Sequence, residues 1–213
     1  MKNELSALLM QKNDELSAEQ QEKILFFYEL LVQENEVQNL TRLISPLDFY
    51  QGHLLDVCEL LKTQWLTFPV MDIGSGCGVP GLLAALMSEG EWVLSESEVR
   101  KAQFLEKAVE ALGLRDRVRV TAKRAEDYLK ENNVPCLAAR AVGPVDRIYT
   151  WIRGSKHCST WNNLILFKGP SWEEEWDRFQ ASKYKKELSI QKIHSYEVGV
   201  EKKKRVLVFL SRN

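Results

Sequence analysis

The stretch Val70-Met-Asp-Ile-Gly-Ser-Gly-Cys-Gly-Val-Pro-Gly81 decides the fold of this chain. It places a glycine-rich loop between an apolar run that predicts a buried strand and a helix that starts near Pro80. Gly74, Gly76 and Gly78 give the backbone torsions that other residues rarely adopt, and they let a ligand approach closely. The free amides at the start of the helix add hydrogen-bond donors. The stretch therefore predicts a βα unit with a binding site at its loop.

On the carboxyl side of this loop, short apolar runs alternate with helical patterns, which predicts further βα units and a parallel sheet. Strands are predicted at Val70–Ile73, Trp92–Ser95, Val118–Thr121, Cys136–Ala139, Asn163–Phe167, Leu188–Val198 and Arg205–Leu210. Helices are predicted at Pro80–Ser88, Glu98–Leu112, Ala125–Glu131 and Val145–Gly154, with a helix or loop at Trp172–Phe179. No helix separates the last two strands, so the turn-like segment Gly199–Lys204 predicts an antiparallel hairpin.

The part of the chain before Pro69 is predicted to be helical. Ser17-Ala-Glu-Gln20 has the form of a capping box, and apolar residues at helical spacing follow it to about Gln33. Asn35–Thr41 is predicted to be the exit loop, and Ser45-Pro46 starts a second helix. We therefore expect a helical extension at 1–66 and a sheet domain at 67–213, packed as one compact unit.

Composition excludes several classes of protein. The 213 residues are 45% hydrophobic and 28% charged, which argues against disorder and small disulfide-rich folds. No long uncharged apolar stretch occurs, and acids interrupt the N-terminus where a signal peptide needs an apolar core, so we expect a cytoplasmic protein. The cysteines are widely spaced and are predicted to be reduced packing residues: Cys58, Cys77, Cys136 and Cys158.

The net charge of −1 does not by itself indicate a nucleic-acid partner. The basic residues nevertheless cluster, and acids concentrate elsewhere, at 14–36 and 172–177. We therefore predict a polarised surface with one basic face near the binding site, although each cluster alone is more typical of a solvated helix face. The clusters are Arg100-Lys101, Arg115–Arg119, Lys123-Arg124, Arg147 with Arg153 and Lys156, Lys183–Lys186, and Lys202–Arg205.

Two acids indicate the ligand of the glycine loop. The loop has the spacing G-x-G-x-G, because Val79 stands where a dinucleotide fingerprint needs glycine. Glu96 ends the second predicted strand, where a carboxylate can hold ribose hydroxyls, unless it is a plain surface residue. Asp72 adds a negative charge that suits a cationic ligand. Together these features indicate S-adenosylmethionine.

Motifs along the chain resemble those of the bacterial small-subunit ribosomal RNA guanine-N7 methyltransferases, the glucose-inhibited division protein B family. The resemblance covers about residues 20 to 210. It implies the Rossmann-like, mostly parallel sheet of a class I S-adenosylmethionine-dependent methyltransferase. The motifs are Asn39-Leu-Thr41, His53-Leu-Leu-Asp56, Asp72 to Gly81, Arg124-Ala-Glu126, Ala139-Arg-Ala-Val142 and Phe167-Lys-Gly169.

The resemblance also implies site residues. It assigns cofactor contacts to Gly74 and Val79, places Ala125 and Glu126 near the adenine ring, and places Arg140 beside the methyl-donor pocket. Ala125 and Arg140 follow predicted strands whose carboxyl ends meet at the glycine loop, which agrees with this assignment. Two positions depart from the family pattern, because Glu96 replaces the usual aspartate and Cys77 replaces alanine or proline.

The implied reaction needs positioning more than proton transfer. Guanine N7 carries a lone pair and no proton, so no general base is required, and orientation supplies most of the catalysis. Arg140 and Lys168 are predicted to fix the base or a nearby phosphate, unless they are structural ion-pair partners. His53 and Asp56 lie three residues apart on one helical face and are predicted to have a structural role.

Other polar and aromatic residues are weaker candidates. His157 and His194 are single histidines, and Trp151 and Trp161 are better explained by core packing than by stacking on a base. We expect a monomer without a metal site, acting on 16S ribosomal RNA or the small subunit. The alternatives are a methyltransferase for a small molecule or protein, and a non-catalytic RNA-binding or assembly factor.

Overall fold

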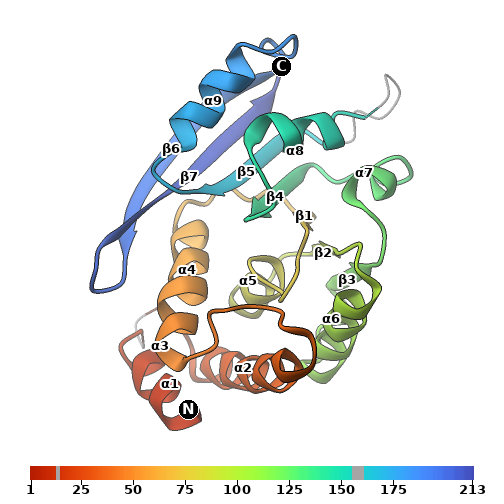
Figure 1. Cartoon of the computed structure of the whole chain (residues 1–213). Helices are drawn as coiled ribbons and strands as arrows, with labels where there is room; N and C mark the ends of the chain where they lie inside the picture. Colours follow the sequence, from red (N-terminus) through yellow and green to blue (C-terminus); the bar gives the residue numbers. More distant parts are fainter. Residues whose placement is uncertain (13–14, 155–160) are drawn as a thin grey trace.

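The computed structural model describes residues 1–12, 15–154 and 161–213, and it places one seven-stranded sheet between two layers of helices (Figure 1). The strands are β1 Val70–Ile73, β2 Trp92–Ser95, β3 Val118–Thr121, β4 Cys136–Arg140, β5 Asn163–Lys168, β6 Leu188–Val198 and β7 Lys203–Arg212. The helices are α1 Lys2–Met10, α2 Ala18–Gln38, α3 Pro46–Phe49, a π-helical turn η1 Tyr50–Leu54, α4 Leu55–Lys62, α5 Gly81–Met87, α6 Val99–Ala111, α7 Ala125–Tyr128, α8 Val145–Ile152 and α9 Trp172–Gln180.

The sheet has the strand order β3-β2-β1-β4-β5-β7-β6. The first five strands of the chain are parallel, and β7 pairs antiparallel with both β5 and β6. The order reverses between β1 and β4, whose register pairs Ile73 with Ala139. Ligands of open parallel sheets bind at such a switch point, beside the carboxyl ends of the strands. The glycine loop after β1 and Arg140 at the end of β4 both lie there.

Two hydrophobic clusters cover the two faces of the sheet. On β4, Cys136 and Ala138 belong to one cluster, and Leu137 and Ala139 belong to the other, because successive side chains of a strand point to opposite faces. The first cluster contains α2, α4, α5 and α6, and the second contains α7, α8 and α9. The N-terminal helices thus pack on one face of the sheet and share its core.

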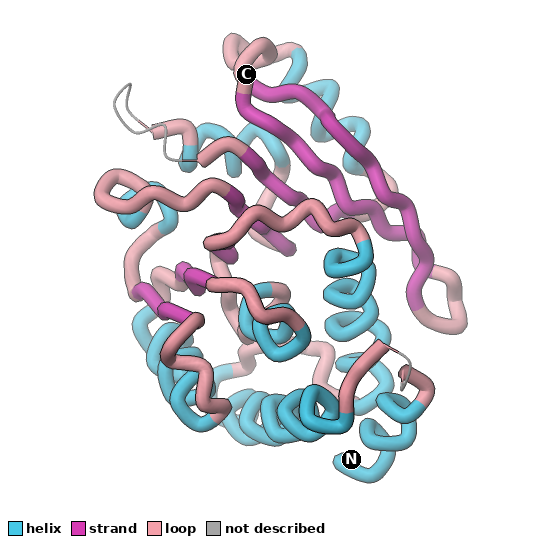
Figure 2. The backbone as a smooth tube through the Cα atoms, turned by 180° about the vertical axis from the view of Figure 1, so that it is seen from behind, coloured by secondary structure: helices cyan, strands magenta, loops and turns pink. Residues whose placement is uncertain are grey.

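The hairpin of β6 and β7 is the longest strand pair of the sheet. It runs past the other strands and along α4 to its turn (Figure 2). Stacking of Trp65 on Phe209, with ring centroids 5.5 Å apart, attaches it to the segment after α4. The hairpin therefore connects the helical N-terminal part with the far edge of the sheet.

Most of the predicted elements are confirmed, including every strand and the capping box of Ser17 and Gln20. The segment Trp172–Phe179, left open between helix and loop, is helical. Two predictions were wrong in detail. The helix α2 continues to Gln38, so the exit loop begins only at Asn39, and the hairpin turn is shorter because β7 already starts at Lys203. The charged residues at these ends lie on solvated faces, where the apolar pattern carries no information about the boundary.

The prediction of one basic face near the binding site was wrong for the cluster Arg115–Arg119. Its arginines line a hollow together with Pro69 and Trp92, at the amino ends of β1, β2 and β3. Arg117 donates to the carbonyl of Ser88, at 2.6 Å, at the end of α5. Crossover connections alternate between the two edges of a parallel sheet, so neighbouring loops of the sequence lie on opposite sides of the molecule. Lys156, which belongs to another cluster, lies outside the described residues.

Candidate active site

The glycine loop, residues 74–80, turns sharply after β1. All three glycines have positive φ, at 67° for Gly74, 51° for Gly76 and 91° for Gly78. Their surroundings differ. A side chain on Gly78 would press against Phe27, Leu82 and Leu105, whereas one on Gly76 would meet only a backbone oxygen 3.8 Å away. Gly78 thus permits close packing of the helices, and Gly76 leaves the outer side of the loop open.

Glu96 fixes this loop from the end of β2. Its carboxylate accepts hydrogen bonds from the backbone amides of Gly76, at 3.0 Å, and Glu98, at 2.8 Å. The residue is buried, with 8% of its surface exposed. The carboxylate therefore lies beside the open position over Gly76. This buried, hydrogen-bonded position does not fit the alternative that Glu96 is a plain surface residue.

Asp72 lies inside the protein. One carboxylate oxygen accepts a hydrogen bond from the amide of Gly81, at 2.9 Å, and the other is buried without a partner in the described part of the chain. Burial raises the pKa of Asp72 to about 7. The carboxylate thus orients the first turn of α5, and neither of its oxygens is exposed at the loop.

Ala125 and Glu126 form the start of α7, just after β3. Ala125 is buried in the same hydrophobic cluster as Ile73 of β1 and Val93 of β2. Glu126 is partly exposed. The hydroxyl of Ser95 donates to the carbonyl of Lys123, at 3.1 Å, and holds this segment against the end of β2. Glycine loop, Glu96 and the start of α7 thus follow three neighbouring strands at one edge of the sheet.

A buried group of polar side chains, which we call the Asp56 network, lies on the other side of Arg140. Asp56 is fully buried in α4. Its carboxylate accepts from the Tyr196 hydroxyl at 2.9 Å and from Arg205 Nη1 at 2.6 Å. Arg140 Nε lies 3.5 Å from the same oxygen that Arg205 contacts. Burial raises the pKa of Asp56, and the two guanidinium groups counteract this shift. The network also contains Thr41 and His53.

His53 contacts Arg140 directly, with 2.9 Å between His53 Nδ1 and Arg140 Nη1. A guanidinium can only donate, so Nδ1 accepts and the proton of the neutral ring is on Nε2. Nε2 lies 3.2 Å from the hydroxyl oxygen of Thr41, which accepts that proton. Burial and the charge of Arg140 lower the pKa of His53 to about 3. His53 is therefore neutral and holds Arg140 by a hydrogen bond. The contacts of His53 and Asp56 are those that a structural role predicts.

Lys168 ends β5 and is almost fully enclosed. Its Nζ donates to Glu175 at 2.6 Å and to the carbonyl of Gly143 at 2.7 Å. Glu175 also accepts from the amide of Val145, at 3.2 Å. Lys168 and Glu175 thus hold the loop that follows Arg140.

A hollow of about 550 Å³, which we call the basic groove, lies between the ends of β4 and β5 and the hairpin. Arg140 lines it, so the part of its guanidinium that His53 and Asp56 do not hold faces this space. Sequence patterns gave no role to Tyr196 and counted Arg205 only as one member of a charge cluster. The lining residues are Arg140, Ala141, Phe167, Lys168, Gly169, Pro170, Tyr196, Lys203, Lys204 and Arg205.

The remaining candidates lie away from this site. Trp161 is fully buried and donates to the carbonyl of Ile152, and Trp151 packs against the same cluster, so packing explains both. His194 of β6 contacts Glu59 of α4, at 2.8 Å. Cys58, Cys77 and Cys136 are buried free thiols, whereas His157 and Cys158 lie outside the described residues. Within residues 1–12, 15–154 and 161–213 there is no group of acids, histidines and cysteines that could hold a metal ion. No helix in these ranges is long and apolar enough to cross a membrane.

Comparison with known families identifies the group of enzymes to which this site belongs. A family model described as rRNA small subunit methyltransferase G matches residues 20–207. The chain belongs to this family. The resemblance stated from the sequence motifs is thereby confirmed, and the matched range contains the glycine loop, Glu96 and every member of the Asp56 network.

Curated relatives support the same assignment. A ribosomal RNA small subunit methyltransferase G of Solibacter usitatus is 33% identical over 175 residues, which cover 80% of this chain and 80% of the relative. The protein of the same name from Rhodopirellula baltica is 33% identical over 166 residues, covering 78% and 70%. Similarity at this level extends over both the helical N-terminal part and the sheet.

Solved structures confirm the fold class. The METTL16 MTase domain superposes with a TM-score of 0.55 at 18% identity, covering 87% of this chain and 79% of that domain. TrmK of M. capricolum, in complex with S-adenosyl-homocysteine, gives a TM-score of 0.50 at 13% identity, covering 68% and 62%. At these identities the likeness shows a common fold, the Rossmann-like sheet of methyltransferases.

Proposed function

We propose that the protein transfers a methyl group from S-adenosylmethionine to N7 of a guanine in 16S ribosomal RNA. Membership of the rRNA small subunit methyltransferase G family supports the class of reaction and substrate. The observation that carries the proposal is the convergence of the family's separated motifs. Thr41, His53, Asp56 and Arg140 meet in one hydrogen-bonded network beside the glycine loop.

The residues around the loop fit this cofactor. Gly74, Gly76, Gly78, Val79, Glu96, Ala125, Glu126 and Arg140 are the proposed cofactor-binding residues. The position over Gly76 is open, and the buried carboxylate of Glu96 beside it has acceptor capacity for ribose hydroxyls. Burial raises the pKa of Asp72 to about 7, and a cationic group nearby would favour its charged form. One of its oxygens has no partner in the described part of the chain. When bound, S-adenosylmethionine supplies an electrophilic methyl group on its sulfonium.

The chain's own contribution is to hold the acceptor base in place. Arg140 is proposed to donate to the guanine, for which O6 is a natural acceptor, so that N7 faces the methyl donor. His53 and Asp56 fix two sides of the guanidinium, so little orientational freedom remains to be lost on binding. Lys168 is proposed to act with Glu175 by keeping the loop after Arg140 in place. N7 carries no proton, so the proposed reaction needs no general base. The histidine of the network, His53, has a pKa lowered to about 3 and is therefore a weak base.

Other features of the proposal concern the whole protein. We propose that residues 1–66 form a helical extension that supplies His53 and Asp56 to the methyltransferase unit 67–213. We further propose a monomer that works in the cytoplasm without a metal ion. Light scattering of the purified protein would test the monomer, and unchanged activity in excess chelator would test the independence from metal.

The test is methyl transfer to small ribosomal subunits from cells that lack the gene for this protein. We expect incorporation of labelled methyl from S-adenosylmethionine, and mapping of the RNA should find N7-methylguanine at one site. Transfer to a protein or a small molecule only would contradict the substrate. Binding of the subunit without any transfer would contradict the reaction and favour an assembly factor.

A further inference from the structure

The basic groove has an unusual distribution of charge. Five of its ten lining residues are lysine or arginine, and none of the described lining residues is acidic. They come from the ends of β4 and β5 and from the start of β7. The groove thus extends from Arg140 toward the hairpin turn.

Internal partners account for only part of this charge. Arg140 and Arg205 share the single carboxylate of Asp56, and Lys168 is paired with Glu175. Lys203 contacts Glu201 at 3.1 Å, but both side chains are more than two thirds exposed, so this pair is weak. Lys204 has no ion pair in the described part of the chain. A surplus of positive charge therefore remains in the groove, chiefly at its hairpin side.

Apolar surface accompanies these cations. Phe167, Pro170 and Tyr196 line the same hollow, and Tyr196 is held in place by the bond of its hydroxyl to Asp56. An inorganic anion makes no favourable contact with aromatic surface. A nucleotide, in contrast, has a base or ribose that packs on such surface and a phosphate that binds the cations. The mixture indicates a nucleic-acid strand.

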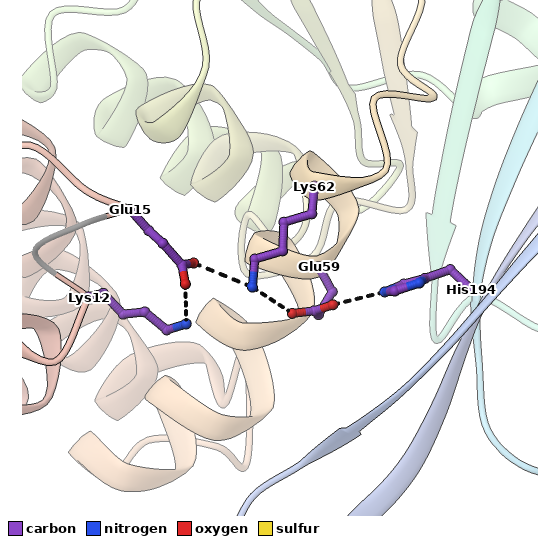
Figure 3. A network of polar contacts seen from close by, with 5 residues as sticks. All are labelled: Lys12, Glu15, Glu59, Lys62 and His194. Carbon is purple, nitrogen blue, oxygen red and sulfur yellow. Dashed lines mark hydrogen bonds and ion pairs between the residues drawn. The ribbon is translucent and has the colours of Figure 1, made fainter.

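Polar contacts connect the hairpin with the N-terminal helices (Figure 3). His194 on β6 contacts Glu59 of α4 at 2.8 Å, and Glu59 contacts Lys62 at 3.0 Å. Lys62 reaches Glu15 at 3.5 Å, which contacts Lys12 at 2.8 Å. This chain of contacts attaches β6 to α4 and to the segment before α2. The lysines at the start of β7 are therefore presented from a supported element.

A second hollow, of about 310 Å³, adjoins the basic groove and shares Lys203 and Arg205 with it. It continues toward the hairpin turn, but Asp48 and Glu201 also line it. In this hollow two acids thus accompany the two shared cations. The basic groove, in contrast, has five cations and no acid among its described lining residues.

We propose that the basic groove binds the RNA strand next to the target guanine, with Lys203 and Lys204 contacting successive phosphates and with Tyr196 and Phe167 against a base or ribose. This inference rests on the proposed function and adds to it a substrate-binding surface on the C-terminal hairpin. Phosphate contacts of this kind position a strand without reading its sequence. The hairpin therefore contributes affinity for RNA, and Arg140 acts on the reacting base.

The test compares two charge reversals of equal size, K203E/K204E in the groove and K185E/K186E as a control. Lys185 and Lys186 are exposed and precede β6, at the end opposite the hairpin turn. Binding of full-length 16S ribosomal RNA is measured by filter binding at several salt concentrations. We expect K203E/K204E to weaken binding at least 10-fold and to lower the slope of log affinity against log salt by about 1.5, since each phosphate contact contributes roughly 0.7 to 0.9.

Kinetics with small subunits separate this inference from the proposed function. K203E/K204E should raise KM for the subunit and leave kcat and the affinity for S-adenosyl-homocysteine unchanged. Equal RNA affinity and salt slope in the wild type and in K203E/K204E would contradict RNA binding by the basic groove. An equal loss of affinity in K203E/K204E and in the control K185E/K186E would contradict it as well. Absence of methyl transfer by the wild type would overturn the proposed function, while the binding comparison still decides the groove.

Discussion

The two sides of the candidate site are built from different kinds of contact. On the loop side, Glu96 and Asp72 accept from backbone amides of the glycine loop and the turns beside it, all within one continuous stretch of chain. On the base side, side chains from distant segments hold Arg140. His53 lies 87 residues away from it in the sequence, and Arg205 lies 149 residues from Asp56. Local backbone geometry makes the first side, and tertiary packing makes the second.

This difference predicts different consequences of substitution. Changes on the loop side should affect cofactor binding and leave the rest of the fold intact. Changes on the base side should affect catalysis and stability together, because the same charges orient Arg140 and join the N-terminal helices to the hairpin.

The largest effect is expected for Gly76→Leu. The new side chain would enter the open position over the loop, so we expect binding of S-adenosyl-homocysteine to be lost in calorimetry. Gly113→Leu is the matched control, since Gly113 also has positive φ, at 67°, with no atom near its added Cβ. Both variants carry a backbone cost of about 1–2 kcal/mol. Normal binding by Gly76→Leu would mean that the cofactor lies elsewhere.

Arg140→Ala tests the base side. We expect kcat/KM to fall by about 100- to 1000-fold, the usual cost of a donor that positions and stabilises a reacting group. Arg119→Ala, an exposed arginine at the opposite edge of the sheet, should keep normal activity.

A double-mutant cycle then asks whether His53 acts through Arg140. His53→Ala alone should lower kcat/KM about 10-fold, but it should add no further loss to Arg140→Ala. Additive losses would contradict the positioning role of His53 and indicate that it contacts the substrate itself.

Asp56→Asn probes the dependence of stability on the network. Removal of the charge leaves two guanidinium groups without their buried partner, and we expect the free energy of unfolding in urea to fall by about 3–5 kcal/mol. Glu59→Gln, three residues later on the same helix, removes a partly exposed charge and should cost less than about 1 kcal/mol. Equal costs would show that the network contributes no more than a surface pair.

The last prediction is a dependence on pH. The pKa of His53 is lowered to about 3, so between pH 3 and about 6.5 only the unfolded chain binds the proton. The contribution of His53 to stability is thus complete above pH 6.5 and is lost as the pH falls, by about 1.4 kcal/mol per unit. The pH dependence that Asp72 gives to the stability has the opposite sign. Its pKa is raised to about 7, so its contribution to the free energy of unfolding is lost as the pH rises toward 7.

The two residues oppose each other in the wild type, so a difference measurement is needed. The stability lost in His53→Asn should increase between pH 4.5 and 6.5 and then stay constant to pH 8, as measured by urea unfolding at each pH. His194→Asn serves as the same substitution at the surface of the hairpin. A loss in His53→Asn that does not change with pH would contradict a neutral buried histidine.

Much of the fold could be predicted from the sequence. The parallel strands other than β3 are short and buried on both faces, so they stand out as apolar runs. The glycine loop and the capping box are local patterns with a fixed geometry. Helix ends were predicted less well. The last turn of α2, up to Gln38, lies on a polar face where hydrophobic periodicity gives no information.

The site could be predicted only in part. Arg140 and Glu96 follow strands whose carboxyl ends meet by the rules of parallel sheets, so their placement was accessible from the sequence. Tyr196 and Glu175 were missed, since each is one polar residue in a charged segment and its partner lies far away in the chain. The basic clusters were misjudged for the same reason, because charge alone does not tell on which edge a loop lies.

The sequence by itself determined the order of strands and helices along the chain, the glycine loop after β1, and the resemblance to a methyltransferase family. These features depend on periodicity and on residues close together in the chain. Only the tertiary structure decided that Asp56 is shared by Arg140 and Arg205, that His53 is neutral, and that the lysines of the hairpin border the same groove as Arg140. Such properties depend on burial and on distances between remote segments, and the fold has to form before either is defined.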